Sequence, residues 1–457
     1  MGTKRHYHIW TIGCQMNVAD SQRVAAGLER LGYSPAERAE DAEVILLNTC
    51  VVRQQPEDKA VGRINQLRRV KERHPDRVLA LMGCMVGVKD PTPLRERFPW
   101  VDVFLPPSDP TELWAFLAAH AAGDEAEAQD EARALIADAE ARRLALGRSD
   151  TILPPSAHGV GAYLPIVLGC SHACTYCVIP YRRGAERSRP MEAILAEARQ
   201  MATQGIKEIT LLGQIVDRYG YDLPEFAGAA ETPLVTLLRR VHDIDGIARL
   251  RFLTSHPNWM KDDLLRAVAE LPKVCEHIEV PIQAGDDEVL ERMRRGYTVD
   301  DYRRLVARLR EIIPGVSIAT DIIVGFPGET EEQFQHTYDL LAELRLDKAH
   351  IARYSSRPLT VATRNFADDL PDVEKERRRK MLDDLQGHIL EALNARYLGQ
   401  TVEVLVEGKN EQKQRWFGRT RTDRLVFFAA DGDRMGELAQ VHITWAGPWS
   451  LIGEREA

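Results

Sequence analysis

Short apolar runs that alternate with helical patterns constrain the fold of this chain more than any other feature. The runs at 44–47 (Val-Ile-Leu-Leu) and 78–82 (Val-Leu-Ala-Leu-Met) contain no polar residue, which is typical of strands buried on both faces of a parallel sheet. Similar strand and helix patterns alternate around them, at 8–12, 17–31, 56–72, 101–104 and 110–121. Residues 4–120 are therefore predicted to form a parallel α/β domain.

The stretch 121–155 differs, because it is rich in Ala, Glu, Asp and Arg and poor in large apolar residues. It is predicted to be a solvated helix or a flexible linker. Beyond it, six strand patterns alternate with helical ones, at 162–168, 206–212, 248–253, 277–282, 317–324 and 349–354. Six such units predict an open, partial (β/α)6 barrel over residues 156–386.

The C-terminal part of the chain changes its period. Residues 374–396 form a strongly charged helical pattern, which we interpret as a solvated connecting helix. Alternation of apolar and polar residues follows at 401–406, 424–428 and 440–444. This period of two, with glycines between the runs, predicts a small antiparallel β-barrel over residues 389–456.

Composition limits the class of protein. The chain has 457 residues and a net charge of −9, which argues against coating nucleic acid through bulk charge but leaves room for a local basic surface. The start is polar, and no apolar stretch approaches the roughly 18 residues of a membrane span. A cytoplasmic location is therefore expected.

Three of the seven cysteines stand in a Cys-x3-Cys-x2-Cys motif, Cys170, Cys174 and Cys177. They follow the first predicted barrel strand, at the end where barrel enzymes place their active sites. Thiolates favour zinc or iron–sulfur clusters, and a structural zinc site needs four ligands. His172 is poorly placed as a fourth ligand, so the motif favours a cluster with one open iron over a zinc knuckle.

An open iron can bind the amino and carboxylate groups of S-adenosylmethionine and pass an electron to its sulfonium. The product is a 5′-deoxyadenosyl radical. The motif closely resembles the signature of the radical S-adenosylmethionine superfamily, so the central barrel is expected to be of that type.

A second group of cysteines, Cys14, Cys50 and Cys84, is dispersed in the sequence, but each follows a predicted strand. The carboxyl ends of parallel strands share one edge of a sheet, so the three thiols are expected to converge and hold a second cluster, whose open iron would hold sulfur. The alternative is three buried structural cysteines. Cys275 is interpreted as a buried structural thiol.

Motifs along nearly the whole chain resemble the radical methylthiotransferases, most closely the MiaB type. The motifs are Gly13-Cys14-Gln15-Met16-Asn17, Leu47-Asn48-Thr49-Cys50, Gly83-Cys84, Cys174-Thr175-Tyr176-Cys177, Leu211-Leu212-Gly213-Gln214, Thr254-Ser255-His256-Pro257 and Asp321-Ile322-Ile323-Val324-Gly325. The C-terminal barrel resembles the RNA-binding TRAM domain of that family.

The resemblance implies two [4Fe-4S] clusters, held by the two cysteine triplets, and two uses of S-adenosylmethionine. It implies a tRNA substrate, in which N6-isopentenyladenosine next to the anticodon gains a methylthio group at carbon 2, and a flavodoxin-like or ferredoxin-like electron donor. Alternative substrates are a threonylcarbamoyl-adenosine tRNA or a ribosomal-protein aspartate. The cysteines would also suit a cluster protein without catalysis, or a zinc protein. No catalytic residue beyond the cluster ligands is assigned.

Basic residues accumulate in the C-terminal barrel around Trp416 and Phe417: Lys409, Lys413, Arg415, Arg419, Arg421 and Arg424. They are predicted to contact an RNA backbone, the alternative being an ordinary charged face. The basic run 182–189 is interpreted either as a phosphate contact or as a salt-bridged loop. Two residues depart from the family pattern: Ile215 replaces an asparagine, and Leu359 replaces a turn glycine.

Overall fold

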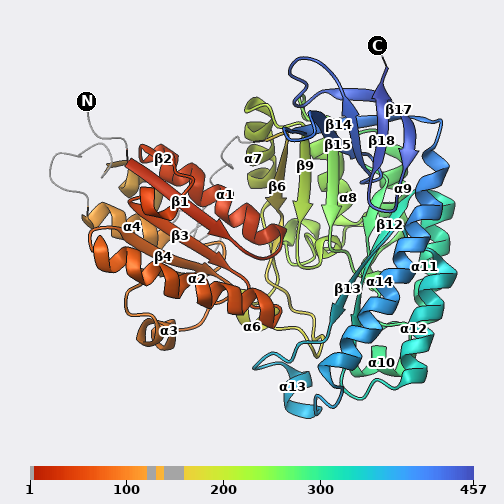
Figure 1. The fold of residues 1–457 in the computed structure, drawn as a ribbon, viewed down its shortest axis with the longest axis horizontal. Helices are drawn as coiled ribbons and strands as arrows, with labels where there is room; N and C mark the ends of the chain where they lie inside the picture. The colour runs from red at the N-terminus through yellow and green to blue at the C-terminus, as the bar shows by residue number, and fades with distance from the viewer. Residues whose placement is uncertain (1–4, 121–129, 138–158, 457) are drawn as a thin grey trace.

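A computed structural model describes residues 5–120, 130–137 and 159–456. The N-terminal unit is a parallel sheet with strand order β2-β1-β3-β4-β5 (Figure 1). Its strands are β1 (Arg5–Thr11), β2 (Tyr33–Pro35), β3 (Val44–Thr49), β4 (Val78–Gly83) and β5 (Val103–Leu105). Its helices are α1 (Gln15–Arg30), α2 (Gln54–Arg73), α3 (Thr92–Arg97) and α4 (Thr111–His120).

The two central strands of this sheet are buried on both faces. Every residue of β3 and β4 is buried. Val44 and Leu46 face a core that α1 and α4 cover, whereas Ile45 and Leu47 face a core that α2 covers. The predicted parallel α/β architecture is confirmed, and the uninterrupted apolar runs follow from this double burial.

Part of the predicted linker belongs to this unit. Residues 130–137 are helical, and Ala132 and Leu135 are buried in the core that α1 and α4 cover. The rest of the 121–155 stretch lies outside the described residues.

The central unit is an open barrel of parallel strands. They are β6 (Gly161–Pro165), β9 (Glu208–Leu212), β10 (Arg249–Leu253), β11 (His277–Glu279), β12 (Ser317–Val324) and β13 (Lys348–Arg353). They form two sheets, β10-β9-β6 and β11-β12-β13, which a bridge between Leu250 and Val274 joins. A two-stranded hairpin of β7 (Val167–Leu168) and β8 (Arg187–Ser188) flanks the loop with the second cysteine triplet.

The longer barrel helices lie on its outer surface, whereas the two five-residue helices lie beyond the carboxyl ends of the strands (Figure 1). They are α6 (Ile179–Arg183), α7 (Met191–Thr203), α8 (Pro233–His242), α9 (Asp262–Glu270), α10 (Asp287–Arg292), α11 (Val299–Ile312), α12 (Glu331–Leu344), α13 (Val361–Asn365) and α14 (Asp372–Asn394). The prediction that α14 is a solvated connection is wrong, because Leu382 and Ile389 are buried in the barrel core. Its many charges hide this narrow apolar stripe in the sequence.

The C-terminal unit is a closed barrel of five strands in the order β14-β15-β16-β18-β17. They are β14 (Thr401–Asn410), β15 (Arg415–Thr420), β16 (Leu425–Ala429), β17 (Leu438–Ala446) and β18 (Leu451–Arg455). All neighbours are antiparallel except β16 and β18, which are parallel. Within the described chain, no helix is both long and apolar enough to cross a membrane.

Candidate functional site

The first cysteine triplet lies at one edge of the N-terminal sheet. Cys14 begins α1 directly after β1, Cys50 follows β3, and Cys84 follows β4. Burial, together with the nearby Cys84 and Cys14 thiols, raises the pKa of Cys50 to about 12. Gly13 allows the close approach, because a Cβ at this position would lie 2.9 Å from Cys50 Cβ. The ends of β1, β3 and β4 lie side by side at this edge, as expected, and that the three thiols hold a cluster there stays a prediction.

A buried arginine from the barrel stands beside these thiols. Arg183 of α6 donates to Asn17 Oδ1 (2.6 Å) and pairs with Asp20 (3.3 Å). Burial raises the pKa of Cys84, and the positive charge of Arg183 opposes that rise. No sequence pattern signals this contact, because Arg183 is only one member of the basic run 182–189.

The second triplet occupies the loop after β7, at the carboxyl end of the barrel strands. Burial raises the pKa of Cys177 to about 12, and the Cys174 and Cys170 thiols add to the rise. Arg295 Nη1 donates to Cys174 Sγ at 3.1 Å. Gly169 has φ +69°, and a Cβ there would lie 2.2 Å from Ala185 O, so the loop requires glycine at this point.

The donor chemistry of both triplets fits an iron–sulfur cluster with one open iron. Buried thiols resist ionisation unless a cation compensates the charge, and iron–sulfur clusters are held by thiolates. In the part of the chain that the structure describes, no three His, Cys, Asp or Glu side chains are grouped around a point suitable for a single metal ion. His172 Nε2 instead lies 2.8 Å from His256 Nε2, away from a fourth-ligand role.

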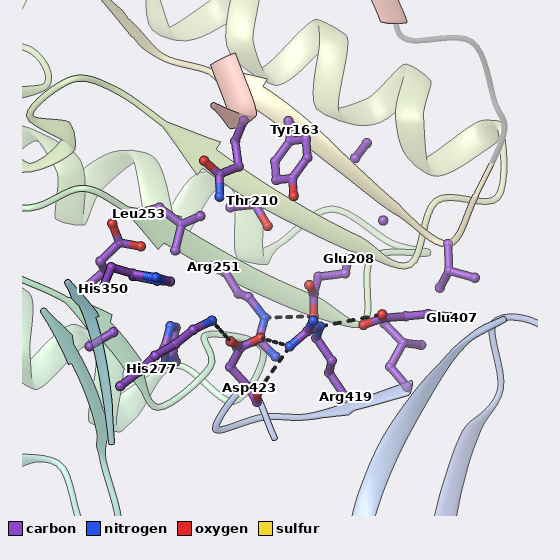
Figure 2. A pocket seen from close by; sticks show the side chains of 18 residues that line it. Tyr163, Glu208, Thr210, Arg251, Leu253, His277, His350, Glu407, Arg419 and Asp423 are labelled. Carbon is purple, nitrogen blue, oxygen red and sulfur yellow. Dashed lines mark hydrogen bonds and ion pairs between the residues drawn. The ribbon is translucent and has the colours of Figure 1, made fainter. Parts of the chain in front are cut away.

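A cavity of about 400 Å³ opens into the barrel interior, and all three units line it (Figure 2). Gln15, the residue after Cys14, contributes from α1. Alternate residues of the barrel strands face the cavity, including Glu208, Thr210, Arg251, Glu279 and His350. The C-terminal barrel closes it with Glu407, Arg419 and Asp423. This cavity was not predicted, although charges at alternate strand positions are a signal for an inward polar face.

Ion pairs balance most charges of the cavity. Arg251 lies 3.0 Å from Glu208, and Arg419 lies 3.1 Å from Asp423. Burial raises the pKa of Glu279 to about 7 and that of Asp321 on the neighbouring strand to about 6. The cavity therefore combines fixed charges with one carboxyl group, Glu279, that titrates close to neutrality, and Asp321 lies on the strand next to it.

The predicted RNA surface of the C-terminal barrel is wrong for half of its members. Arg419 lines the cavity, Arg421 pairs with Glu276 of the central barrel (2.6 Å), and Arg424 pairs with Asp347. These arginines dock the small barrel onto the amino-terminal ends of the β-strands of the large one. Lys409, Lys413 and Arg415 remain on the β14–β15 hairpin.

The burial of individual side chains tests three further expectations, which concern Trp416, the basic run 182–189 and Cys275. Trp416 is 5 % exposed, so its ring is a core residue. In the run 182–189, Arg183 and Arg189 are buried in ion pairs with Asp20 and Glu197, which supports the salt-bridged interpretation for these two. Cys275 is buried, as expected.

The two departures from the family pattern have different surroundings. Ile215 is buried in the same apolar cluster as Cys84 and Cys170, so it packs where the two triplet loops approach. Leu359 has φ +77° and is 44 % exposed, so the turn does adopt the backbone conformation that favours glycine.

Comparisons with known proteins agree with this geometry. Residues 164–341 match the Radical SAM superfamily, residues 6–106 match Uncharacterized protein family UPF0004, and residues 395–455 match the TRAM domain. The chain is 49 % identical to the tRNA-2-methylthio-N(6)-dimethylallyladenosine synthase of Roseiflexus sp. (strain RS-1), covering 98 % of this chain and 89 % of the relative. It is 46 % identical to the protein of the same name from Herpetosiphon aurantiacus, covering 99 % and 98 %.

A solved structure resembles the fold. The radical S-adenosylmethionine methyltransferase TsrM from Kitasatospora setae, with cobalamin and a [4Fe-4S] cluster bound, superimposes with a TM-score of 0.51. Sequence identity is 19 %, and the match covers 79 % of this chain and 77 % of that one. At this identity the likeness concerns the fold alone.

Proposed function

Because this chain belongs to the family of tRNA-2-methylthio-N(6)-dimethylallyladenosine synthases, we propose that it adds a methylthio group to carbon 2 of N6-isopentenyladenosine in tRNA. The observation that supports this most is the pair of cysteine triplets, one at the carboxyl ends of the parallel strands in each of the first two units. The proposed domains are residues 4–120, 156–386 and 389–456.

In this proposal, Cys170, Cys174 and Cys177 hold the cluster that binds S-adenosylmethionine, and Cys14, Cys50 and Cys84 hold the cluster that carries sulfur. The bound groups supply the radical and the methylthio unit. Arg295 fixes Cys174 through its 3.1 Å hydrogen bond, and Arg183 places a positive charge beside Cys84. A hydrogen bond to sulfur and a nearby charge both shift the reduction potential of an iron–sulfur cluster.

The cavity is the proposed site for the target nucleotide. Its volume of about 400 Å³ is within the range of small-molecule sites, and Gln15, which lines it, follows Cys14 in the chain. The paired charges offer hydrogen-bond partners to base and ribose. A tRNA substrate is favoured over a ribosomal-protein aspartate, because the C-terminal unit matches a TRAM domain, the RNA-binding unit that the family resemblance implied.

The proposed reaction also needs an electron donor of the flavodoxin or ferredoxin kind, because each reductive cleavage of S-adenosylmethionine to the 5′-deoxyadenosyl radical consumes one electron. The proposed location is the cytoplasm, where tRNA and such donors occur together.

The test uses the anaerobically reconstituted full chain with S-adenosylmethionine, a reductant and either isopentenylated or threonylcarbamoylated tRNA. Nucleoside mass analysis should show one methylthio group only on the isopentenylated tRNA. Cys50→Ala and Cys174→Ala should each halve the iron and sulfide content, and Cys275→Ala, the matched control, should leave it unchanged. Gain of the group on the other tRNA, or full iron in both triplet variants, would contradict the proposal.

A further inference from the structure

The β17–β18 hairpin of the C-terminal barrel presents two tryptophans to solvent. Trp445 is 49 % exposed and Trp449 is 68 % exposed. Exposed large aromatic rings are unusual on a protein surface and mark places where partners bind. We propose that this hairpin tip is a stacking platform for the tRNA; the inference rests on the proposed function and adds a binding surface to it.

The tip is held rigidly from below. The buried side-chain amide of Asn394, the last residue of α14, donates to Gly447 O (2.7 Å) and Pro448 O (3.1 Å). Gly447 N donates to Ser450 O (3.0 Å) and closes the turn. A platform that is already ordered loses little conformational entropy when a base stacks on it.

Trp445 is also held at one of its faces. Its ring lies over Gly447, where an added Cβ would come within 2.2 Å of a ring atom. The absence of a side chain at residue 447 therefore lets the ring lie flat against the backbone. The exposed half of the ring is left for a base, whose stacking is sequence-tolerant.

Unpaired positive charges lie next to the tip. A surface hollow of about 490 Å³ is lined by Arg310, Arg345, Arg396, Tyr397 and Arg424, and Arg396 is two residues from Asn394. In the described chain, no hydrogen bond or ion pair uses the guanidinium of Arg345 or Arg396. The acidic residues of the hollow are engaged, Glu343 by Arg303 and Asp347 by Arg424. Free guanidinium groups beside exposed rings suit a phosphate backbone with stacked bases.

The hollow lies on the other side of two ion pairs from the cavity proposed for the target nucleotide, Arg424 with Asp347 and Lys348 with Asp423. Arg424 and Asp347 line the hollow, while their chain neighbours Asp423 and Lys348, 3.6 Å apart, line the cavity. The tip offers a protein partner only two aromatic rings bordered by arginines. The negative phosphates of RNA match the positive charge of these arginines better.

Direct binding measurements test the platform. Fluorescence anisotropy of labelled isopentenylated tRNA with the reconstituted full chain should show roughly 5- to 100-fold weaker affinity for Trp445→Ala and for Trp449→Ala. Trp449→Phe should retain most of the affinity, because it keeps an aromatic face. Val373→Ala, at a residue 83 % exposed at the other end of α14, is the matched control and should not change it.

The two free arginines of the hollow are expected to affect the salt dependence of tRNA binding. Arg345→Ala and Arg396→Ala should each lower the slope of log Kd against log salt by about one. Unchanged affinity in the double tryptophan variant would overturn the proposal and leave the tip to a protein partner. The assay uses neither S-adenosylmethionine nor reductant. Weaker RNA binding without any methylthio product would thus contradict only the proposed function, and product formation with unchanged affinity would contradict only the platform.

Discussion

Leu359 occupies a turn that suits glycine better. Its φ of +77° is a left-handed conformation that costs an L-residue about 1–2 kcal/mol. Glycine avoids this cost, but its unfolded state is more flexible, which lowers the stability of the folded state by about 0.5–1 kcal/mol. We expect Leu359→Gly to stabilise the protein by about 0.5–1 kcal/mol, measured by thermal unfolding. Leu359→Ala is the control, because it keeps the strain; a gain of equal size there would assign the effect to the exposed leucine side chain.

Glu279 predicts a pH dependence. Burial raises its pKa to about 7 from 4.5, so the folded state binds a proton more tightly than the unfolded state. Its contribution to stability is therefore complete below about pH 4.5 and is lost as the pH rises through 7. The midpoint of unfolding in the wild type should fall between about pH 5 and about pH 7.5 more steeply than in Glu279→Gln. Parallel profiles for the two proteins would refute the assignment.

The residues at the candidate site differ in how visible they are in the sequence. The cysteine triplets could be predicted, since each follows a strand pattern, and the turn at Leu359 could be predicted from a departure at a glycine position. The contacts of Arg183 and Arg295 with cysteines could not, because the guanidinium groups come from distant loops. Ile215 replaces the asparagine of the family pattern, and only the structure shows that it lies in an apolar cluster.

At the scale of elements, strands buried on both faces were predicted within a few residues because their apolar runs are uninterrupted. Two strands of the small barrel, β15 and β18, were missed. β15 carries arginines and glycine among its apolar residues, and β18 has only two large apolar residues, which glycine and two charged residues follow. The local sequence pattern also could not show which face of this small barrel packs against the central barrel. Some of the arginines predicted to contact RNA lie in that interface.

Arg421 gives the test of this reassignment. It donates to Glu276 (2.6 Å) and to the carbonyls of Pro272 and Val274. Arg421→Gln should lower the unfolding midpoint, as Glu276→Gln should, and the double variant should fall less than the sum because the two groups interact directly. The salt dependence of tRNA binding should be unchanged in Arg421→Gln. A slope lowered by about one would instead restore Arg421 as a phosphate contact.

At the scale of the whole molecule, buried polar pairs fix the N-terminal unit on the rim of the barrel (Figure 1). Glu197 of α7 lies 3.0 Å from Arg23 of α1 and 2.6 Å from Arg189. Arg357 pairs with Glu57 on α2. The partners are up to 300 residues apart in the chain, so no local pattern reveals them. Because the two triplets belong to different units, these pairs set how the two cysteine sites lie relative to each other, and in the proposed function that relation couples radical formation to sulfur transfer.

Glu197 is the most direct test of that relation. Removing one partner of a buried ion pair leaves uncompensated charge and costs about 3–5 kcal/mol, here at the contact between the two units. In Glu197→Gln we therefore expect 5′-deoxyadenosine to form still, while the methylthiolated nucleoside falls severalfold, so that their ratio rises. Chromatography of both products from one reaction gives this ratio. Glu192→Gln, which breaks an exposed pair with Arg240 on the same helix as Glu197, should leave it unchanged. A parallel loss of both products in Glu197→Gln would mean that the contact supports the barrel itself and does not align the two cysteine sites.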